Sequence, residues 1–205
     1  MRSAVSAKYG LLGIWCIAFL ASCASSPPRH TDNICDIFDE KNGWYKDAAR
    51  ATKRWNIPIA VNMSFMYQES RFRSKAKPGR TRILWVIPGP RKSNAYGYAQ
   101  AKTDTWKRYK REAGSWGADR DDFDDAIDFI AWYNRLSANE LKINPNDAKS
   151  LYLAYHEGRG GFRRRSYAKK RWLIKTADQV AARARRYQRQ LSTCEKRLHH
   201  SWWPF

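Results

Sequence analysis

Apolar residues recur at helical spacing along most of the chain, and this period predicts a fold built from α-helices. The expected helices cover residues 34–55, 58–70, 103–113, 121–141, 148–156 and 175–194. Residues 71–96 break the helical period, and within them the apolar run 83–87 fits either a short strand or a loop. The pattern therefore predicts an all-α fold with one irregular inserted segment at about residues 71–96.

The N-terminal segment has the charge and size pattern of an export signal. Arg2 and Lys8 precede a short apolar run at residues 9–20, and small residues follow that run. This order is typical of a secretory signal peptide. The apolar run is too short to favour a helix that spans a membrane, although an uncleaved membrane anchor is the alternative interpretation.

The residues Leu20, Ala21, Ser22 and Cys23 also resemble the cleavage signal of bacterial lipoproteins. The resemblance implies that Cys23 becomes the lipid-bearing first residue, and that the protein is sent to the outer membrane because the following residue is not Asp. The chain then divides into a signal peptide (1–22), a lipidated tether (23–33), a helical domain (34–198) and a tail (199–205). We therefore expect a periplasmic domain that is anchored to the outer membrane through Cys23.

The four cysteines fit an exported protein. Cys16 would leave with the signal peptide and Cys23 would carry the lipid, so Cys35 and Cys194 remain in the domain. Disulfides form and persist in an oxidising compartment, and we expect a bridge between these two residues. Two free buried thiols are the alternative.

The net charge of the chain limits the classes of molecule that are expected to bind it. It has 39 Lys and Arg against 19 Asp and Glu, a formal net charge of +20, and such a surface attracts polyanions. Nucleic acid is not expected as a partner, because an exported lipoprotein seldom meets it. The acidic residues 121–125 suit the N-terminus of a helix, and we expect no metal and no cofactor.

Three short motifs carry the candidate chemistry. They are Glu69-Ser70 at the end of the second predicted helix, residues 97–100 (Gly-Tyr-Ala-Gln), and residues 154–158 (Ala-Tyr-His-Glu-Gly). In this order they resemble the motifs of SLT-type lytic transglycosylases, which are Glu-Ser, Gly-Leu-Met-Gln and Ala-Tyr-Asn-Ala-Gly. The resemblance covers about residues 45–190, and it implies a lysozyme-like helical domain that acts on peptidoglycan.

The resemblance also implies roles for individual residues. Glu69 would protonate the glycosidic oxygen between MurNAc and GlcNAc and then act as the base, which leaves a 1,6-anhydro-MurNAc end. An apolar wall, expected from the sequence neighbours Phe65, Met66 and Tyr67, would raise the pKa of Glu69 enough for this role. The residues expected to contact the glycan are Ser70, Tyr98, Gln100, Tyr155 and His156.

The chain departs from the family at several of these positions, and two other functions stay open. Tyr98 and His156 stand where the family has Leu and Asn, and Glu157 stands where it has Ala. A lysozyme-type hydrolase would need a second carboxylate, for which Asp104 and Glu157 are the candidates. Asp104 is otherwise expected as a helix cap and Glu157 as a solvent-exposed residue at a helix end. The other alternative is a basic lipoprotein that binds peptidoglycan without cleaving it.

Overall fold

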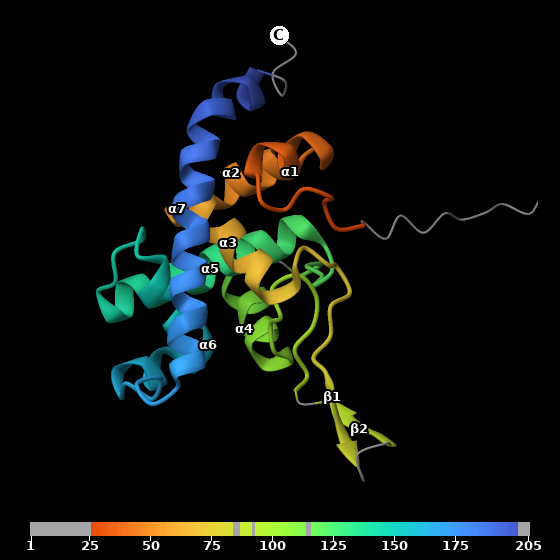
Figure 1. Ribbon diagram of the computed structural model, residues 1–205, viewed down its shortest axis with the longest axis vertical. Helices are drawn as coiled ribbons and strands as arrows, with labels where there is room; N and C mark the ends of the chain where they lie inside the picture. Colours follow the sequence, from red (N-terminus) through yellow and green to blue (C-terminus); the bar gives the residue numbers. More distant parts are fainter. Residues whose placement is uncertain (1–25, 84–86, 92, 114–115, 201–205) are drawn as a thin grey trace, which may run out of the picture.

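The computed structural model of the protein describes residues 26–83, 87–91, 93–113 and 116–200. Within these residues it contains seven helices and one hairpin, which confirms the predicted helical fold class (Figure 1). The helices are α1 (Ile34–Glu40), α2 (Trp44–Trp55), α3 (Ile59–Ser70), α4 (Thr103–Ala113), α5 (Phe123–Leu141), α6 (Ala148–Arg163) and α7 (Arg171–His200). The predicted signal peptide, Cys23 and residues 201–205 lie outside the described residues.

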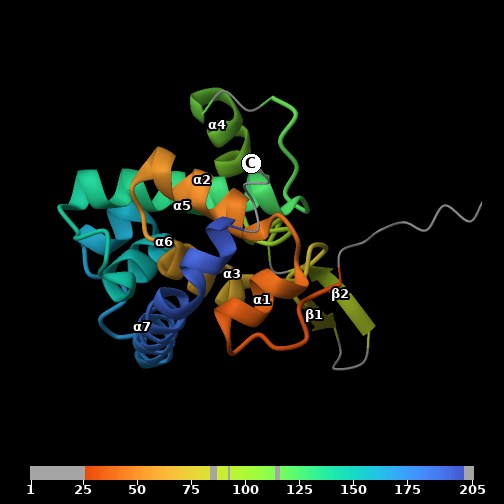
Figure 2. The same ribbon diagram turned by 90° about the horizontal axis from the view of Figure 1, so that it is seen from above.

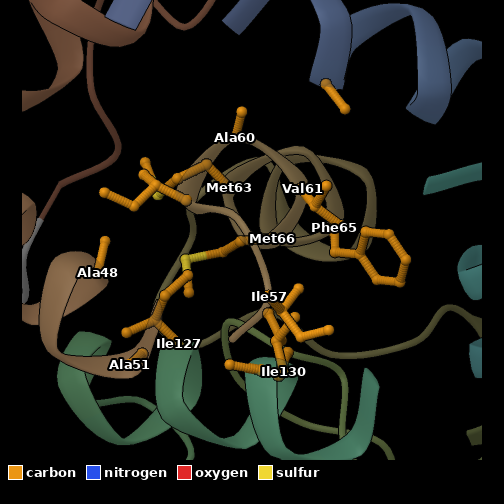
Figure 3. Close-up of a cluster of buried hydrophobic side chains, with 14 of the residues drawn as sticks. Ala48, Ala51, Ile57, Ala60, Val61, Met63, Phe65, Met66, Ile127 and Ile130 are labelled. Atoms are coloured by element: carbon orange, nitrogen blue, oxygen red, sulfur yellow. The ribbon is translucent and has the colours of Figure 1, made fainter. Parts of the chain in front are cut away.

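Helix α3 lies at the centre of the fold. All eight residues from Ile59 to Met66 are buried, so this helix has no solvent-facing side over its first two turns. Helices α2, α5 and α7 pack against it. Figure 3 shows side chains from α2 and α5 beside Met63 and Met66 of α3. Apolar burial on all sides therefore fixes the position of the helix that ends with Glu69.

Helix α7 is longer than the sequence pattern predicted. It has 30 residues rather than the span 175–194, and its buried stripe continues from Leu173 to Leu198. His199, the first residue of the expected tail, belongs to this helix, and the centre of its ring lies 5.1 Å from that of Tyr45. No helix in the described part of the chain has the length and apolarity needed to cross a membrane.

The N-terminal residues of the described chain are bound to α7. A disulfide joins Cys35 of α1 to Cys194 of α7, as predicted. The hydroxyl of Tyr187 donates to the carbonyl of Thr31, and Gln190 Nε2 donates to the carbonyl of Asp32 at 3.1 Å. Thr31 and Asp32, which the sequence placed in the expected tether, are thus bound to α7 through their backbone carbonyls.

Two predicted helix boundaries were wrong. The first predicted helix is divided at residues 41–43 into α1 and α2. Helix α6 does not stop at Gly158 but continues to Arg163 through a kink, in which Gly158 has φ 73° and ψ 159°. A glycine tolerates this positive-φ, non-helical conformation without a steric cost, so the chain bends there and resumes the helix.

The predicted irregular insertion contains an antiparallel hairpin. Strand β1 (Arg80–Ile83) pairs with β2 (Ile87–Arg91), with Arg82 opposite Pro88 and Ile83 opposite Ile87. The hairpin extends from the helical body (Figures 1 and 2). Proline is tolerated on edge strands, and both strands of a two-stranded sheet are edges. This explains how β2 forms although it contains Pro88 and Pro90, and of the two alternatives left open for residues 83–87 the strand is the one seen at Ile83 and Ile87.

Candidate active site

Glu69 lies in the last turn of α3, and the chain reverses directly after it. Arg71 caps the helix in the left-handed conformation (φ 54°) and donates its backbone N–H to the carbonyl of Tyr67 at 2.8 Å. Phe72 also has a positive φ and is fully buried against the ring of Trp44. The buried Phe72 therefore anchors the turn that fixes Glu69 at the helix end. The negative end of the helix dipole disfavours a charged carboxylate there.

A cavity of about 360 Å³ opens beside Glu69. It is lined by Glu69, Gln100, Ala101, Lys102, Thr105, Phe129, Tyr133, Tyr155, His156, Glu157 and Gly158. Four of the predicted site residues are in this set, and they come from α3, the turn before α4, and α6. The structure therefore brings one residue or more from each of the three sequence motifs to a single cavity.

Burial controls the protonation of Glu69. It raises the pKa of the Glu69 carboxyl to about 7, and a hydrogen bond with Tyr152 opposes this only in part. The ring of Phe65, one turn before Glu69, meets the rings of Tyr152 and Tyr155 edge to face at 5.3 and 5.4 Å. An apolar surrounding disfavours the charged form of an acid. Glu69 is thus protonated for a large fraction of the time near neutral pH.

The raised pKa predicts a pH-dependent stability change for Glu69→Gln. Between pH 4.5 and about 7 the native protein keeps a proton that the unfolded chain releases, so native stability falls across this interval and stays lower above it. Replacing Glu69 by Gln removes the ionisable carboxyl, so the native protein no longer loses stability across this pH interval. We expect Glu69→Gln to raise the free energy of unfolding by on the order of 2–3 kcal/mol at alkaline pH. At acidic pH the substitution should leave the free energy of unfolding nearly unchanged.

Urea unfolding of wild type and Glu69→Gln at two pH values, one on each side of the interval, measures this difference. A gain in the free energy of unfolding that is the same at both pH values would contradict the raised pKa, because the benefit would then not come from ionisation.

The second motif holds Gln100 by backbone contacts. Gln100 has φ 48°, and its Nε2 donates to the carbonyls of Ala76 and Gly97 at 3.0 and 2.9 Å. A Cβ atom on Gly97 would lie 1.9 Å from the carbonyl oxygen of Arg120, so only glycine fits. The side-chain amide of Gln100 therefore ties the start of the insertion to the cavity wall.

Tyr155 has a comparable positioning contact. Its hydroxyl donates to the carbonyl of Ala99 at 2.7 Å, which joins the third motif to the second. Burial raises the pKa of Tyr155 well above its usual value, so the phenol stays protonated. Tyr155 lines the cavity with its ring, while its hydroxyl holds the neighbouring turn in place.

Ser70 and Tyr98 do not reach the cavity. Both are about 1% exposed. The hydroxyl of Ser70 donates to the carbonyl of Met66 at 3.1 Å, and the ring of Tyr98 packs edge to face against Trp44 at 5.8 Å. The predicted glycan contacts of these two residues are therefore not supported, because their side chains are used inside the fold.

His156 and Glu157 form a polar cluster on the cavity wall. His156 Nδ1 lies 3.0 Å from Glu157 Oε1, and Lys170 Nζ lies 2.7 and 2.8 Å from the two Glu157 oxygens. Ser166 also donates to Glu157. Burial alone would raise the pKa of Glu157, but the hydrogen bonds from Lys170, Ser166 and His156 outweigh it and lower the pKa to about 2.

The ionised Glu157 sets the role of His156. A carboxylate has no proton to give, so His156 Nδ1 is the donor in this contact. In the tautomer with Nδ1 as the donor, Nε2 is an acceptor for a hydroxyl or amide N–H of a ligand. His156 was expected to contact the glycan, and it lines the cavity beside Glu69.

The two candidate second carboxylates differ in position. Glu157 lines the Glu69 cavity, whereas Asp104 is exposed and lines a neighbouring cavity with Arg108 and Arg159. Glu157 was expected at a solvent-exposed helix end, yet its side chain is only 5% exposed. That prediction was wrong because the segment after the Gly158 kink folds Lys170 back over it.

The acidic residues before α5 are engaged by protein groups. Asp122 caps the helix by accepting from the N–H groups of Asp124 and Asp125. Asp121 accepts from the hydroxyl of Tyr96 at 2.8 Å. In the part of the chain that the structure describes, no three His, Cys, Asp or Glu side chains gather as a metal site would require.

Sequence reasoning missed Tyr152 and Lys170. Tyr152 lies one helical turn before Tyr155, so the helical period alone would have placed both on the face toward Glu69. Lys170 carries no such signal, because it lies 13 residues from Glu157 in a segment whose path depends on the Gly158 kink.

Comparison with known protein families agrees with the gathering of the three sequence motifs at one cavity. The family described as transglycosylase SLT domain matches residues 11–194, which include every residue that lines the Glu69 cavity. None of the curated proteins that were searched matches the chain. Because the family match covers most of the 205 residues, the chain belongs to the transglycosylase SLT domain family and is a lytic transglycosylase, an enzyme that acts on peptidoglycan.

Proposed function

We propose that the Glu69 cavity cleaves the MurNAc–GlcNAc bond by intramolecular transglycosylation and leaves 1,6-anhydro-MurNAc ends. The observation that carries this proposal is the state of Glu69, whose partly buried carboxyl has a pKa raised to about 7 beside a cavity of about 360 Å³. A carboxyl with a pKa near the operating pH can both give and take a proton efficiently.

In the first step, protonated Glu69 gives its proton to the oxygen that links MurNAc to GlcNAc. The bond between that oxygen and C1 of MurNAc breaks, so GlcNAc leaves with a new hydroxyl and C1 becomes an oxocarbenium-like centre. Glu69 is now ionised. Its negative charge is close to the positive centre and favours it electrostatically.

In the second step, the C6 hydroxyl of the same MurNAc attacks C1. The ionised Glu69 takes the hydroxyl proton, which restores the protonated acid and closes the 1,6-anhydro ring. No water is consumed, and one carboxyl group serves both steps.

The contacts of Glu157 favour intramolecular transglycosylation over a hydrolysis that uses two carboxylates. A nucleophile needs an oxygen that is free to approach C1. Each Glu157 oxygen already contacts Lys170, one also contacts His156 and the other contacts Ser166. Glu157 is therefore assigned as an anchor for His156 and Lys170 and not as the second catalytic carboxylate.

Digestion of purified sacculi in water enriched in heavy oxygen tests the reaction type. We expect the new MurNAc ends to carry no heavy oxygen and to be one water lighter in mass than hydrolysis products. Heavy oxygen at the new ends, lost in Glu157→Gln, would instead make the protein a hydrolase with Glu157 as its second carboxylate. Binding of sacculi without any cleavage would support the non-catalytic alternative.

A further inference from the structure

Trp172 is an exposed aromatic side chain beside the Glu69 cavity. It is 58% exposed, and its ring lies 5.2 Å from the ring of His156 at an interplanar angle of 78°. His156 in turn lines the cavity. An edge-to-face contact of this kind engages only one side of one ring, so much of the indole surface is open to a ligand that extends out of the cavity.

The chain holds Trp172 firmly on both sides. Lys170, two residues before it, is paired with Glu157 at 2.7 Å. Leu173, directly after it, is fully buried and donates its backbone N–H to the carbonyl of Lys170 at 2.9 Å. The exposed ring is thus mounted on a fixed backbone, and binding to it loses little conformational entropy.

The carboxylate of Glu157 holds both the His156 ring and the residues that precede Trp172 in position. Glu157 accepts from His156 Nδ1 and pairs with Lys170, so it sets the imidazole and the start of α7 at the same time. This contact leaves His156 Nε2 available to a ligand, next to the exposed indole. An apolar face and a polar atom then lie side by side at the edge of the cavity.

We propose that Trp172 and His156 form a platform for one sugar ring of the glycan strand, which extends the binding surface beyond the Glu69 cavity. A pyranose ring has a face of C–H groups that packs on an aromatic ring, and hydroxyl and amide groups at its edge. Trp172 takes the C–H face, and His156 Nε2 accepts from the polar edge. This platform rests on the proposed glycan cleavage, since it supplies affinity for the same substrate.

Binding by an inactive enzyme tests the platform without the reaction. Each variant is made in the Glu69→Gln background, and its Kd for peptide-free glycan strands is measured. We expect Trp172→Ala to weaken binding about tenfold and Trp172→Phe, which keeps an aromatic face, to weaken it by less than about threefold. Trp116→Ala is the matched control, because Trp116 is 78% exposed and does not line the cavity; its Kd should stay unchanged.

Ionic strength separates stacking from charge. Arg171 and Lys169 are exposed next to Trp172 and attract the acidic strand, but salt screens such attraction. The Trp172→Ala deficit should therefore persist at high salt. A deficit that disappears at high salt, or equal binding by Trp172→Ala and Trp116→Ala, would overturn the platform and leave the proposed cleavage intact. Failure of the Glu69→Gln parent to bind glycan, with no cleavage by wild type, would overturn the proposed function as well.

Discussion

Glu69→Gln is expected to lower the rate of peptidoglycan cleavage by about 100- to 10,000-fold, the usual contribution of a general acid or base. Glutamine has nearly the same shape as glutamic acid, but it can neither give a proton to the glycosidic oxygen nor take one from the C6 hydroxyl. Both steps of the proposed reaction use this one carboxyl, so no other group among the cavity-lining residues compensates for its loss.

The rate is measured as soluble muropeptide released from sacculi at several enzyme concentrations. Glu112→Gln is a matched control, since it removes an exposed carboxylate that is paired with Arg108 on the same helix and does not line the Glu69 cavity. It should cleave at the wild-type rate, and helical circular dichroism should be the same for all three proteins. Glu69→Gln activity within a fewfold of wild type would reject Glu69 as the catalytic acid.

Removing the disulfide is expected to have the largest effect on stability. The bond joins residues separated by 159 positions, and it closes nearly the whole domain into one loop. In the chain-entropy account, a loop of this length contributes about 5 kcal/mol by restricting the unfolded chain. We expect Cys35→Ser with Cys194→Ser to lower the free energy of unfolding by about this amount, and to lower Tm by roughly 2–4 °C per kcal/mol.

Single and double variants check that the effect comes from the bond. Cys35→Ser, Cys194→Ser and the double variant each lose the same disulfide, so their denaturant midpoints should agree closely. Wild type unfolded under reducing conditions should match them. A double variant within about 1 kcal/mol of oxidised wild type would mean that the contacts of Thr31 and Asp32 with α7 already hold the N-terminal residues in place.

The parts of the fold that follow local rules were predictable. The apolar period of residues 58–70 gave a helix that ends beside Glu69, and the structure has α3 at Ile59–Ser70. The acidic residues before α5 were expected to complement a helix N-terminus, and Asp122 caps that helix. Cys35 and Cys194 were paired on compartment and elimination, and they form a bridge. The signal peptide and the lipid on Cys23 stay predictions.

The parts that depend on contacts between distant segments were not predictable from the pattern. Tyr98 occupies a motif position expected to contact the glycan, but the aromatic rings of Trp44 and Phe123 bury it. The apolar wall near Glu69 was expected from its sequence neighbours Phe65, Met66 and Tyr67. Phe65 does contact the rings of Tyr152 and Tyr155, but Met66 lies in the core and Tyr67 packs against Arg183, at 3.4 Å from ring centre to guanidinium carbon. The tyrosines of α6 supply the wall.

The contacts around Glu157 were also not predictable from the sequence pattern. Its sequence position suggested a solvated helix end, and the ionic contacts that bury it come from Lys170 beyond a kink. A helix period cannot foresee a bend that depends on one glycine conformation. The position of Trp172 beside His156 depends on that same bend, so the helical pattern did not predict it.

The central claim is that Glu69 carries out both proton transfers of a reaction that consumes no water. The most direct test is mass analysis of the fragments that wild type and Glu69→Gln release from the same sacculi. The account predicts that wild type produces 1,6-anhydro-MurNAc ends and that Glu69→Gln produces almost none. Reducing MurNAc ends from wild type, or anhydro ends in equal amounts from both proteins, would contradict it.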